Sequence, residues 1–215
     1  MNQSPEKQVS AFSGQENNMG ENTNTDKQII LASLNGHPED FRVLLDRYGS
    51  RILALCRRLV GAAHEAEDLT QKTFVDAYTK LHTFDTLRPF WPWLSRIAVN
   101  NCKDFFKSSK RKEVPFNIDC SSQEGIHPVK WDNPEKTRLM EERRFIIEQA
   151  LMKIPMKYRT VLEMKDIQGL DYCEIENVLD LPVTTLKIRT IRARKKLERA
   201  VDLVISEMRS RHAKR

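Results

Sequence analysis

Apolar residues recur at three- and four-residue steps through most of the chain, and this period predicts amphipathic helices. A short helix, with ordered structure beginning near Asp26, ends at Asn35 and Gly36, and Pro38 starts the next helix. The inward face of the following helix is predicted to hold Phe41, Leu44, Leu45, Tyr48, Ile52, Leu55, Cys56 and Leu59. After Gly61, a further inward face holds Ala66, Leu69, Thr73, Phe74, Ala77, Tyr78 and Leu81.

The next apolar run follows a loop at residues 83–89 and predicts another helix. Its inward stripe contains Phe90, Trp93, Leu94, Ile97, Ala98, Asn101 and Phe105. Trp91 falls off this stripe, so we do not expect it in the core. Lys103, Lys107, Lys110, Arg111 and Lys112 add a basic cluster at the end of the helix. Cations beside aromatic rings suit single-stranded nucleic acid, although rings on the stripe are expected in the core.

Two segments lack a sustained apolar period. Residues 1–26 are rich in Asn, Gln, Ser and Glu and hold too little apolar surface to offset ordering entropy, which predicts a disordered tail. Residues 113–136 contain Pro115, Pro128 and Pro134 and predict a flexible linker. The prediction is therefore an all-α fold with two helical domains, at 27–112 and 137–215.

The second domain begins with Asn133 and Pro134, a cap followed by a proline. The first helix should bury Leu139, Phe145, Ile146, Ala150 and Leu151, and the next should stop at Gln168 and Gly169. Asp171 and Glu174 then match a capping box. Ile175, Val178 and Leu179 are expected to pack against a last helix through Leu186, which predicts a helix-turn-helix.

The last helix is strongly cationic. Residues 186–215 hold eleven Lys and Arg against three Asp and Glu, a net charge of +8, whereas the whole chain carries +6. Such a concentration is typical of phosphate-backbone binding. A solvated basic helix end, favoured by the helix dipole, is the alternative, and charge by itself does not separate the two.

Composition and motifs exclude several classes of protein. No apolar run reaches the roughly 18 to 20 residues of a membrane span, and the N-terminus lacks an apolar signal core, so we expect a cytoplasmic protein. The four cysteines form no C-x-x-C pair, and His64 and Glu65 begin a zincin-like motif in which Asp68 stands where histidine is needed. We find no catalytic constellation, and therefore predict neither an enzyme nor a metal or other cofactor.

Three motifs, in this order and separated by the linker, resemble those of the extracytoplasmic-function (ECF) class of the sigma-70 family of bacterial sigma factors. They are EDLTQ at 67–71, FWPWL at 90–94 followed by RIAVN at 96–100, and the helix-turn-helix with Glu174, Ile175, Thr185 and the triplet RAR at 192–194. The resemblance covers about residues 26–204. It implies binding to core RNA polymerase and promoter DNA, and it leaves a cognate anti-sigma factor open.

The resemblance also assigns residues to each role. The helix that binds the β′ clamp helices of the polymerase would present Glu67, Asp68, Leu69, Thr70 and Gln71, while a second polymerase contact is expected at the β flap. The minus-ten element would be bound by Asp85, Thr86, Leu87, Arg88, Trp91, Asn100, Asp104 and Lys107. The minus-thirty-five element would be bound by Lys165, Thr184, Thr185, Lys187, Ile188, Arg189, Ile191, Arg192 and Arg194.

Some positions depart from the family pattern. Glu176 replaces a small residue where the two helices of the helix-turn-helix are expected to cross, and Asp180, Thr184 and Ile188 also differ. These changes leave the DNA sequence preference undetermined. A competing hypothesis is a transcriptional regulator that uses only the helix-turn-helix, with residues 27–112 as a dimerisation or sensor domain.

Overall fold

The computed structural model describes the backbone of residues 19–109 and 134–212, and these residues form helices and turns without a strand. The N-terminal bundle contains α1 (Met19–Leu34), η1 (Pro38–Asp40), α2 (Phe41–Val60), α3 (Ala63–Thr79), η2 (Leu81–Thr83) and α4 (Phe90–Ser109). The C-terminal bundle contains α5 (Pro134–Lys153), α6 (Met156–Leu162), the π-helical turn η3 (Glu163–Ile167), α7 (Tyr172–Leu179) and α8 (Val183–His212). The predicted all-α fold is confirmed.

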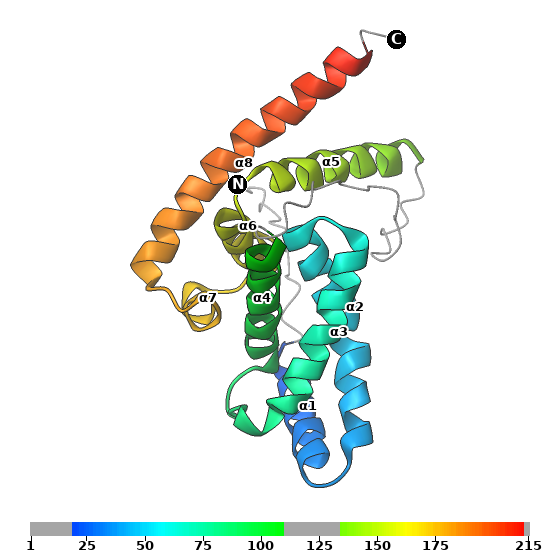
Figure 1. Ribbon diagram of the computed structural model, residues 1–215, viewed down its shortest axis with the longest axis vertical. Helices are drawn as coiled ribbons and strands as arrows, with labels where there is room; N and C mark the ends of the chain where they lie inside the picture. The colour runs from blue at the N-terminus through cyan, green and yellow to red at the C-terminus, as the bar shows by residue number, and fades with distance from the viewer. Residues whose placement is uncertain (1–18, 110–133, 213–215) are drawn as a thin grey trace, which may run out of the picture.

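In the N-terminal bundle, α2, α3 and α4 pack side by side around the apolar stripes that the sequence predicts (Figure 1). Leu44, Ile52, Leu55, Ala66 and Leu94 are fully buried. Cys56 is also buried, as predicted, and its Sγ lies 3.9 Å from that of Cys102 on α4. The α2 helix ends at Gly61 in the left-handed region, so the predicted break is confirmed.

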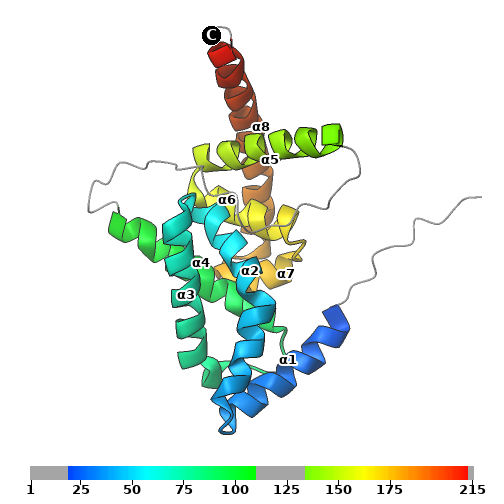
Figure 2. The same cartoon turned by 90° about the vertical axis from the view of Figure 1, so that its right-hand side faces the viewer.

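The helix α1 begins earlier than expected. Order was predicted to start near Asp26, but α1 runs from Met19 and crosses the lower end of α2 (Figure 2). Asp26 is buried, where it accepts a hydrogen bond from the Tyr48 hydroxyl and pairs with Arg47. Apolar content could not predict this contact, because the side chains that hold α1 here are polar. The rest of the predicted tail, residues 1–18, lies outside the described residues.

In the C-terminal bundle, α5 crosses α8, and α6 also packs on α8 (Figure 1). The helix α5 starts at Pro134, as predicted from the cap and proline, so the last three residues of the predicted linker 113–136 are helical; residues 110–133 lie outside the described part of the chain. Ala150 and Leu151 are buried, but Leu139 and Phe145 are 48% and 40% exposed, contrary to prediction. The inward face of α5 is therefore limited to the part near its end, where Ala150 and Leu151 are buried.

The two bundles pack against each other: α4 lies along α7, and α2 contacts α5 and α6. Both figures show the C-terminal bundle seated on one end of the N-terminal bundle (Figure 1, Figure 2). Sequence patterns within each helix gave no sign of this packing. Among the described residues, no helix is long and apolar enough to cross a membrane.

Candidate polymerase and promoter interfaces

The first candidate surface lies on the outward face of α3. Glu67, Asp68 and Gln71 are exposed there, whereas Leu69 is only 6% exposed and belongs to the core. Thr70 is half-buried, and its hydroxyl donates to the Ala66 carbonyl at 2.7 Å. The motif therefore divides into three exposed polar side chains and two residues that fix the helix beneath them.

An apolar groove of about 630 Å³ lies beside these polar side chains, between α2 and α3. Glu67, Thr70 and Gln71 form its polar edge. Its apolar lining consists of Phe41, Leu45, Leu53, Phe74, Val75 and Tyr78. The exposed fractions of Leu45, Val75 and Tyr78 are 44%, 65% and 47%, so the prediction that Leu45 and Tyr78 point inward was wrong. A patch of exposed apolar side chains with a polar rim is typical of a protein-binding surface.

The loop between α3 and α4 carries four of the residues assigned to the minus-ten element. Asp85 holds the loop in a turn: its carboxylate accepts from the Leu87 amide at 3.0 Å, and its carbonyl accepts from the Arg88 amide at 3.0 Å. Thr86 is half-buried, while Leu87, at 84% exposed, points an apolar side chain into solvent. An apolar group on a locally ordered loop can pack against an unstacked base.

The exposed side of α4 carries the other minus-ten candidates. Asn100, Asp104 and Lys107 are exposed and line a polar hollow of about 480 Å³ between α3 and α4. The hollow also contains Lys72, Asp76, Lys80, Ile97, Asn101 and Lys103, which sequence reasoning did not assign. Burial, followed by the nearby charges of Arg96, Lys107 and Arg189, lowers the pKa of Lys103. The hollow thus combines lysines, two of them paired with Asp76 and Asp104, with amide groups that can bond to base edges, and this mixture suits a nucleotide strand.

Trp91 is buried although its position off the stripe predicted otherwise, while Trp93, expected in the core, packs against it. Trp91 is only 6% exposed, whereas Trp93 is partly buried against the core. The Trp91 ring stacks on Tyr48 and lies under the Arg51 guanidinium, 3.7 Å from the ring centroid. Its Nε1 donates to Gln168 of the C-terminal bundle at 3.0 Å. Trp91 is therefore a contact between bundles in this conformation, and it is not open to DNA.

The helix-turn-helix is built as the sequence predicts. The Asp171 carboxylate accepts from the Glu174 amide at 2.7 Å, and the Glu174 carboxylate accepts from the Asp171 amide at 2.8 Å, so the capping box is confirmed. Asp180 ends α7 in the left-handed region, at φ 57°. Glu176 does not lie in the helix crossing: it is exposed and accepts from the Val183 amide at 3.2 Å, which caps the start of α8.

The first turns of α8 present one open face. Thr184, Lys187, Ile188, Ile191 and Arg192 are exposed at helical spacing, with Ile188 and Ile191 at 52% and 58%. Thr185 and Arg189 are half-buried. The opposite face is fixed by the buried residues Leu186, Thr190 and Ala193. The exposed face matches most of the predicted minus-thirty-five set.

Two other members of that set make internal contacts. Arg194 forms a two-pronged ion pair with Asp166, at 2.5 and 3.0 Å, so its guanidinium is already engaged within the bundle. The Lys165 ammonium donates to the Leu170 carbonyl at 3.0 Å and lies 4.9 Å from the Tyr172 ring centroid. Lys187 approaches the same ring at 6.0 Å. The Tyr172 ring therefore lies close to the ammonium groups of Lys165 and Lys187, beside the start of α8.

Comparison with known proteins gives a consistent result. Residues 44–112 match the family described as Sigma-70 region 2, and residues 144–197 match Sigma-70, region 4. The chain is 35% identical over 178 residues to the ECF RNA polymerase sigma factor SigW of Bacillus subtilis, covering 80% of this chain and 95% of that protein. It is 31% identical over 186 residues to the RNA polymerase sigma-H factor of Pseudomonas aeruginosa, covering 85% and 96%.

Solved structures share the fold. CnrH, in complex with the cytosolic domain of CnrY, matches with a TM-score of 0.58 and 27% identity, covering 83% of this chain and 97% of that one. The sigma factor RpoE of Bartonella quintana, in complex with the anti-sigma factor NepR, matches in fold with a TM-score of 0.61 and 21% identity, covering 76% and 98%. This chain belongs to the sigma-70 family, in its ECF class.

Proposed function

We propose that this protein is an ECF sigma factor, which binds core RNA polymerase and directs it to promoters. One observation carries the proposal. The same chain holds two separate helices suited to DNA, α4 and α8, and a third surface on α2 and α3 whose apolar groove is suited to protein. A helix-turn-helix regulator could use the groove to dimerise but would not need a second DNA-binding helix, whereas a promoter-specificity subunit needs all three surfaces.

In this proposal, the groove and its polar edge bind the β′ clamp helices. Val75 and Tyr78 would bury apolar surface against the partner, and Asp68 and Gln71 would form polar contacts at the rim. Interfaces commonly combine an apolar centre with a polar border of this kind. We assign the second contact, with the β flap, to the C-terminal bundle.

The minus-ten element would bind at the 85–88 loop and along the exposed side of α4. Leu87, on the ordered loop, would pack against an unstacked base, and Asn100 and Asp104 would form hydrogen bonds with base edges. The lysines that line the polar hollow would contact the phosphates. Base-edge contacts would select the sequence, and the lysines would supply affinity that weakens with salt.

The minus-thirty-five element would be read by the start of α8. Lys187 and Arg192 can donate to guanine edges in a major groove, and Ile188 and Ile191 can contact thymine methyl groups. Arg194 would position the helix through Asp166 instead of reading a base. The start of α8 would then supply both sequence readout and, through its remaining cations, phosphate binding.

A helix-turn-helix regulator that works without the polymerase core is the second candidate, favoured by the cationic α8, which could bind DNA unaided. Retention of core polymerase by the tagged protein separates the two. We expect the native chain to retain core enzyme and Val75→Glu in the groove to lose it. Val43→Glu makes the same change at another exposed valine, which lies on α2 and does not line the groove, and this variant should retain core enzyme. No retention by the native chain, or equal retention by Val75→Glu, would favour the regulator.

A further inference from the structure

Two thiols face each other in the core of the N-terminal bundle. Cys56 on α2 and Cys102 on α4 are 46 positions apart in the sequence, yet the Cys102 thiol donates a hydrogen bond to the Cys56 sulfur at 3.9 Å. Both side chains are fully buried and carry free thiols. Because the sulfurs of a disulfide lie about 2.05 Å apart, an approach of about 2 Å separates this pair from a covalent bond.

The surroundings of the pair distinguish the two sulfurs. The hydrogen bond from Cys102 lowers the pKa of Cys56; burial opposes this effect, and a hydrogen bond with Thr70 adds to it. The hydrogen bond to Cys56 and burial raise the pKa of Cys102, and the positive charge of Arg159 partly offsets them. Since the thiolate is the nucleophile, Cys56 is the thiol that reacts first, although either order ends in the same disulfide.

The pair lies beneath the apolar groove of α2 and α3. Thr70 lines the groove, is half-buried, and reaches the Cys56 sulfur. Leu53, about one helical turn before Cys56, lines the same groove. A small displacement of Thr70 would therefore admit a molecule as small as hydrogen peroxide, whereas a large oxidant would stay outside. Burial should make this oxidation slower than that of an exposed thiol.

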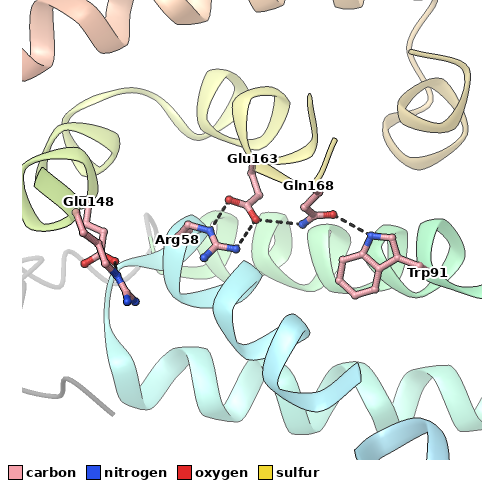
Figure 3. A network of polar contacts seen from close by, with 6 residues as sticks. Arg58, Trp91, Glu148, Glu163 and Gln168 are labelled. Carbon is pink, nitrogen blue, oxygen red and sulfur yellow. Dashed lines mark hydrogen bonds and ion pairs between the residues drawn. The ribbon is translucent and has the colours of Figure 1, made fainter. Parts of the chain in front are cut away.

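The end of α2 that carries Cys56 is held in place. Arg58 forms a two-pronged ion pair with Glu163, from Nε to Oε2 at 2.5 Å and from Nη2 to Oε1 at 2.7 Å (Figure 3). The buried Arg159 donates to the Leu59 carbonyl one residue further on. These contacts fix the last turn of α2, so Cys56 stays opposite its partner on α4.

Oxidation of the pair by peroxide balances without another reactant. The Cys56 sulfur attacks one peroxide oxygen and the O–O bond breaks, which gives a sulfenic acid and, with the Cys56 proton, a water molecule. The Cys102 sulfur then attacks the Cys56 sulfur, the S–O bond breaks, and the released hydroxide takes the Cys102 proton. Two thiols are oxidised to one disulfide, and one peroxide is reduced to two waters.

We propose that Cys56 and Cys102 form a redox-sensitive pair, in which peroxide creates a disulfide between α2 and α4 and a dithiol reductant removes it. A reactive thiol beside a second thiol that resolves it is typical of redox sensors. Bond formation draws the sulfurs together beneath the groove wall formed by Leu53 and Thr70. A partner that fits the groove closely should then bind less well. The effect on polymerase binding rests on the proposed function; the disulfide itself does not.

The test is the intact mass of the folded protein after treatment with hydrogen peroxide. The chain carries Cys120→Ser and Cys173→Ser, so that the pair is its only source of thiols. After the peroxide is removed, an alkylating reagent added with denaturant marks every thiol that is still free. We expect the protein to lose two hydrogen atoms and to take up no alkyl group. Treatment with dithiothreitol should restore both alkylation sites, and digestion should yield peptides joined through Cys56 and Cys102.

The matched control adds Cys102→Ser, which leaves Cys56 without a partner and should abolish the cross-link. The proposal is overturned if the folded protein keeps two alkylated thiols, or gains oxygen without a cross-link, at a peroxide dose that oxidises the exposed Cys173 of the native chain. If Cys102→Ser does not fold by circular dichroism, digestion of the oxidised native chain decides. Peptides joined through Cys56 and Cys102 must then outnumber those that contain Cys120 or Cys173.

Retention of core polymerase by the tagged protein tests the effect on the groove. We expect the reduced protein to retain core enzyme, the disulfide form to retain several-fold less, and dithiothreitol to reverse the loss. Equal retention by the two forms would overturn the effect on the groove. If the reduced protein retains no core enzyme while the disulfide forms as expected, the redox pair is supported and the proposed function is contradicted.

Discussion

The helices α4 and α8 are both assigned to DNA, yet they are held in opposite ways. The 20 residues of α4 are packed along much of their length, with Phe90, Leu94, Ala98 and Cys102 buried, and its cations stand near Asp104 and Asp76. The 30-residue α8 is held by one narrow buried face, from Leu186 to Val204, and leaves a cationic face open. A rigid helix with balanced charge suits selection among unstacked bases, whereas an open cationic helix suits groove binding that depends on salt.

The largest expected effect tests how the burial of side chains differs between α4 and the open face of α8. Leu94→Ala on α4 removes a fully buried side chain from the centre of the N-terminal bundle and should lower the free energy of unfolding by about 2–5 kcal/mol. Ile191→Ala on the open face of α8 should change it by no more than about 0.5 kcal/mol. Urea unfolding followed by circular dichroism measures both. Equal losses would contradict the burial of Leu94 and the exposure of Ile191 on which the comparison rests.

The next effect tests readout by α8. Arg192→Ala should weaken promoter binding by about 1–3 kcal/mol and relax the preference at one upstream position. Lys195→Ala, an exposed cation further along the helix, should weaken all sequences alike and flatten the salt dependence by about one unit. Binding of the protein to a randomised duplex library at two salt concentrations separates these patterns. If Arg192→Ala also weakens every sequence equally, that arginine positions the protein and does not read a base.

A smaller effect is expected at the capping box that starts the helix-turn-helix. Asp171→Ala leaves the Glu174 amide without its acceptor and should lower the free energy of unfolding by about 1 kcal/mol. Asp171→Asn keeps an acceptor and should restore most of the loss. Thermal unfolding of the two variants beside the parent is the measurement. An Asp171→Ala protein as stable as the parent would show that the box contributes little to holding α7.

The smallest effect on stability accompanies a large effect on function. Asp68→Ala combined with Gln71→Ala changes two exposed side chains on α3, so the free energy of unfolding should shift by no more than about 0.5 kcal/mol. Competition with a labelled parent for core polymerase should nevertheless weaken. If the folded double variant competes normally, Asp68 and Gln71 do not contribute to polymerase binding. The apolar groove would then be the centre of the polymerase-binding surface.

Much of the fold could be predicted from the sequence because its signals are local. Gly61 and Gly169 end helices in the left-handed region, and Asp171 with Glu174 starts α7. The family motifs placed residues on α3, α4 and α8 that the structure leaves exposed in most cases. Helix ends, caps and exposed faces depend on residues within about four positions of one another, so they can be predicted from the sequence.

The main failures concern what lies against a particular side chain. Trp91 lies off the apolar stripe of its own helix, yet Tyr48, Arg51 and Gln168 cover it. Tyr78 lies on the predicted stripe of α3 but opens onto the groove. Glu176 appeared misplaced in the sequence, and the structure shows it capping α8. Helical periodicity identifies a face of a helix; it does not say whether a second domain, a groove or solvent will meet that face.

Transcription in vitro, with core RNA polymerase and a library of genomic promoters, tests the central claim most directly. The proposal predicts transcripts that require both core enzyme and this protein, and that start downstream of a shared sequence with two parts at a fixed spacing. The Val75→Glu variant should abolish them, and Val43→Glu should not. If core polymerase makes the same transcripts with and without this protein, the chain does not direct initiation and the assignment of its surfaces is contradicted.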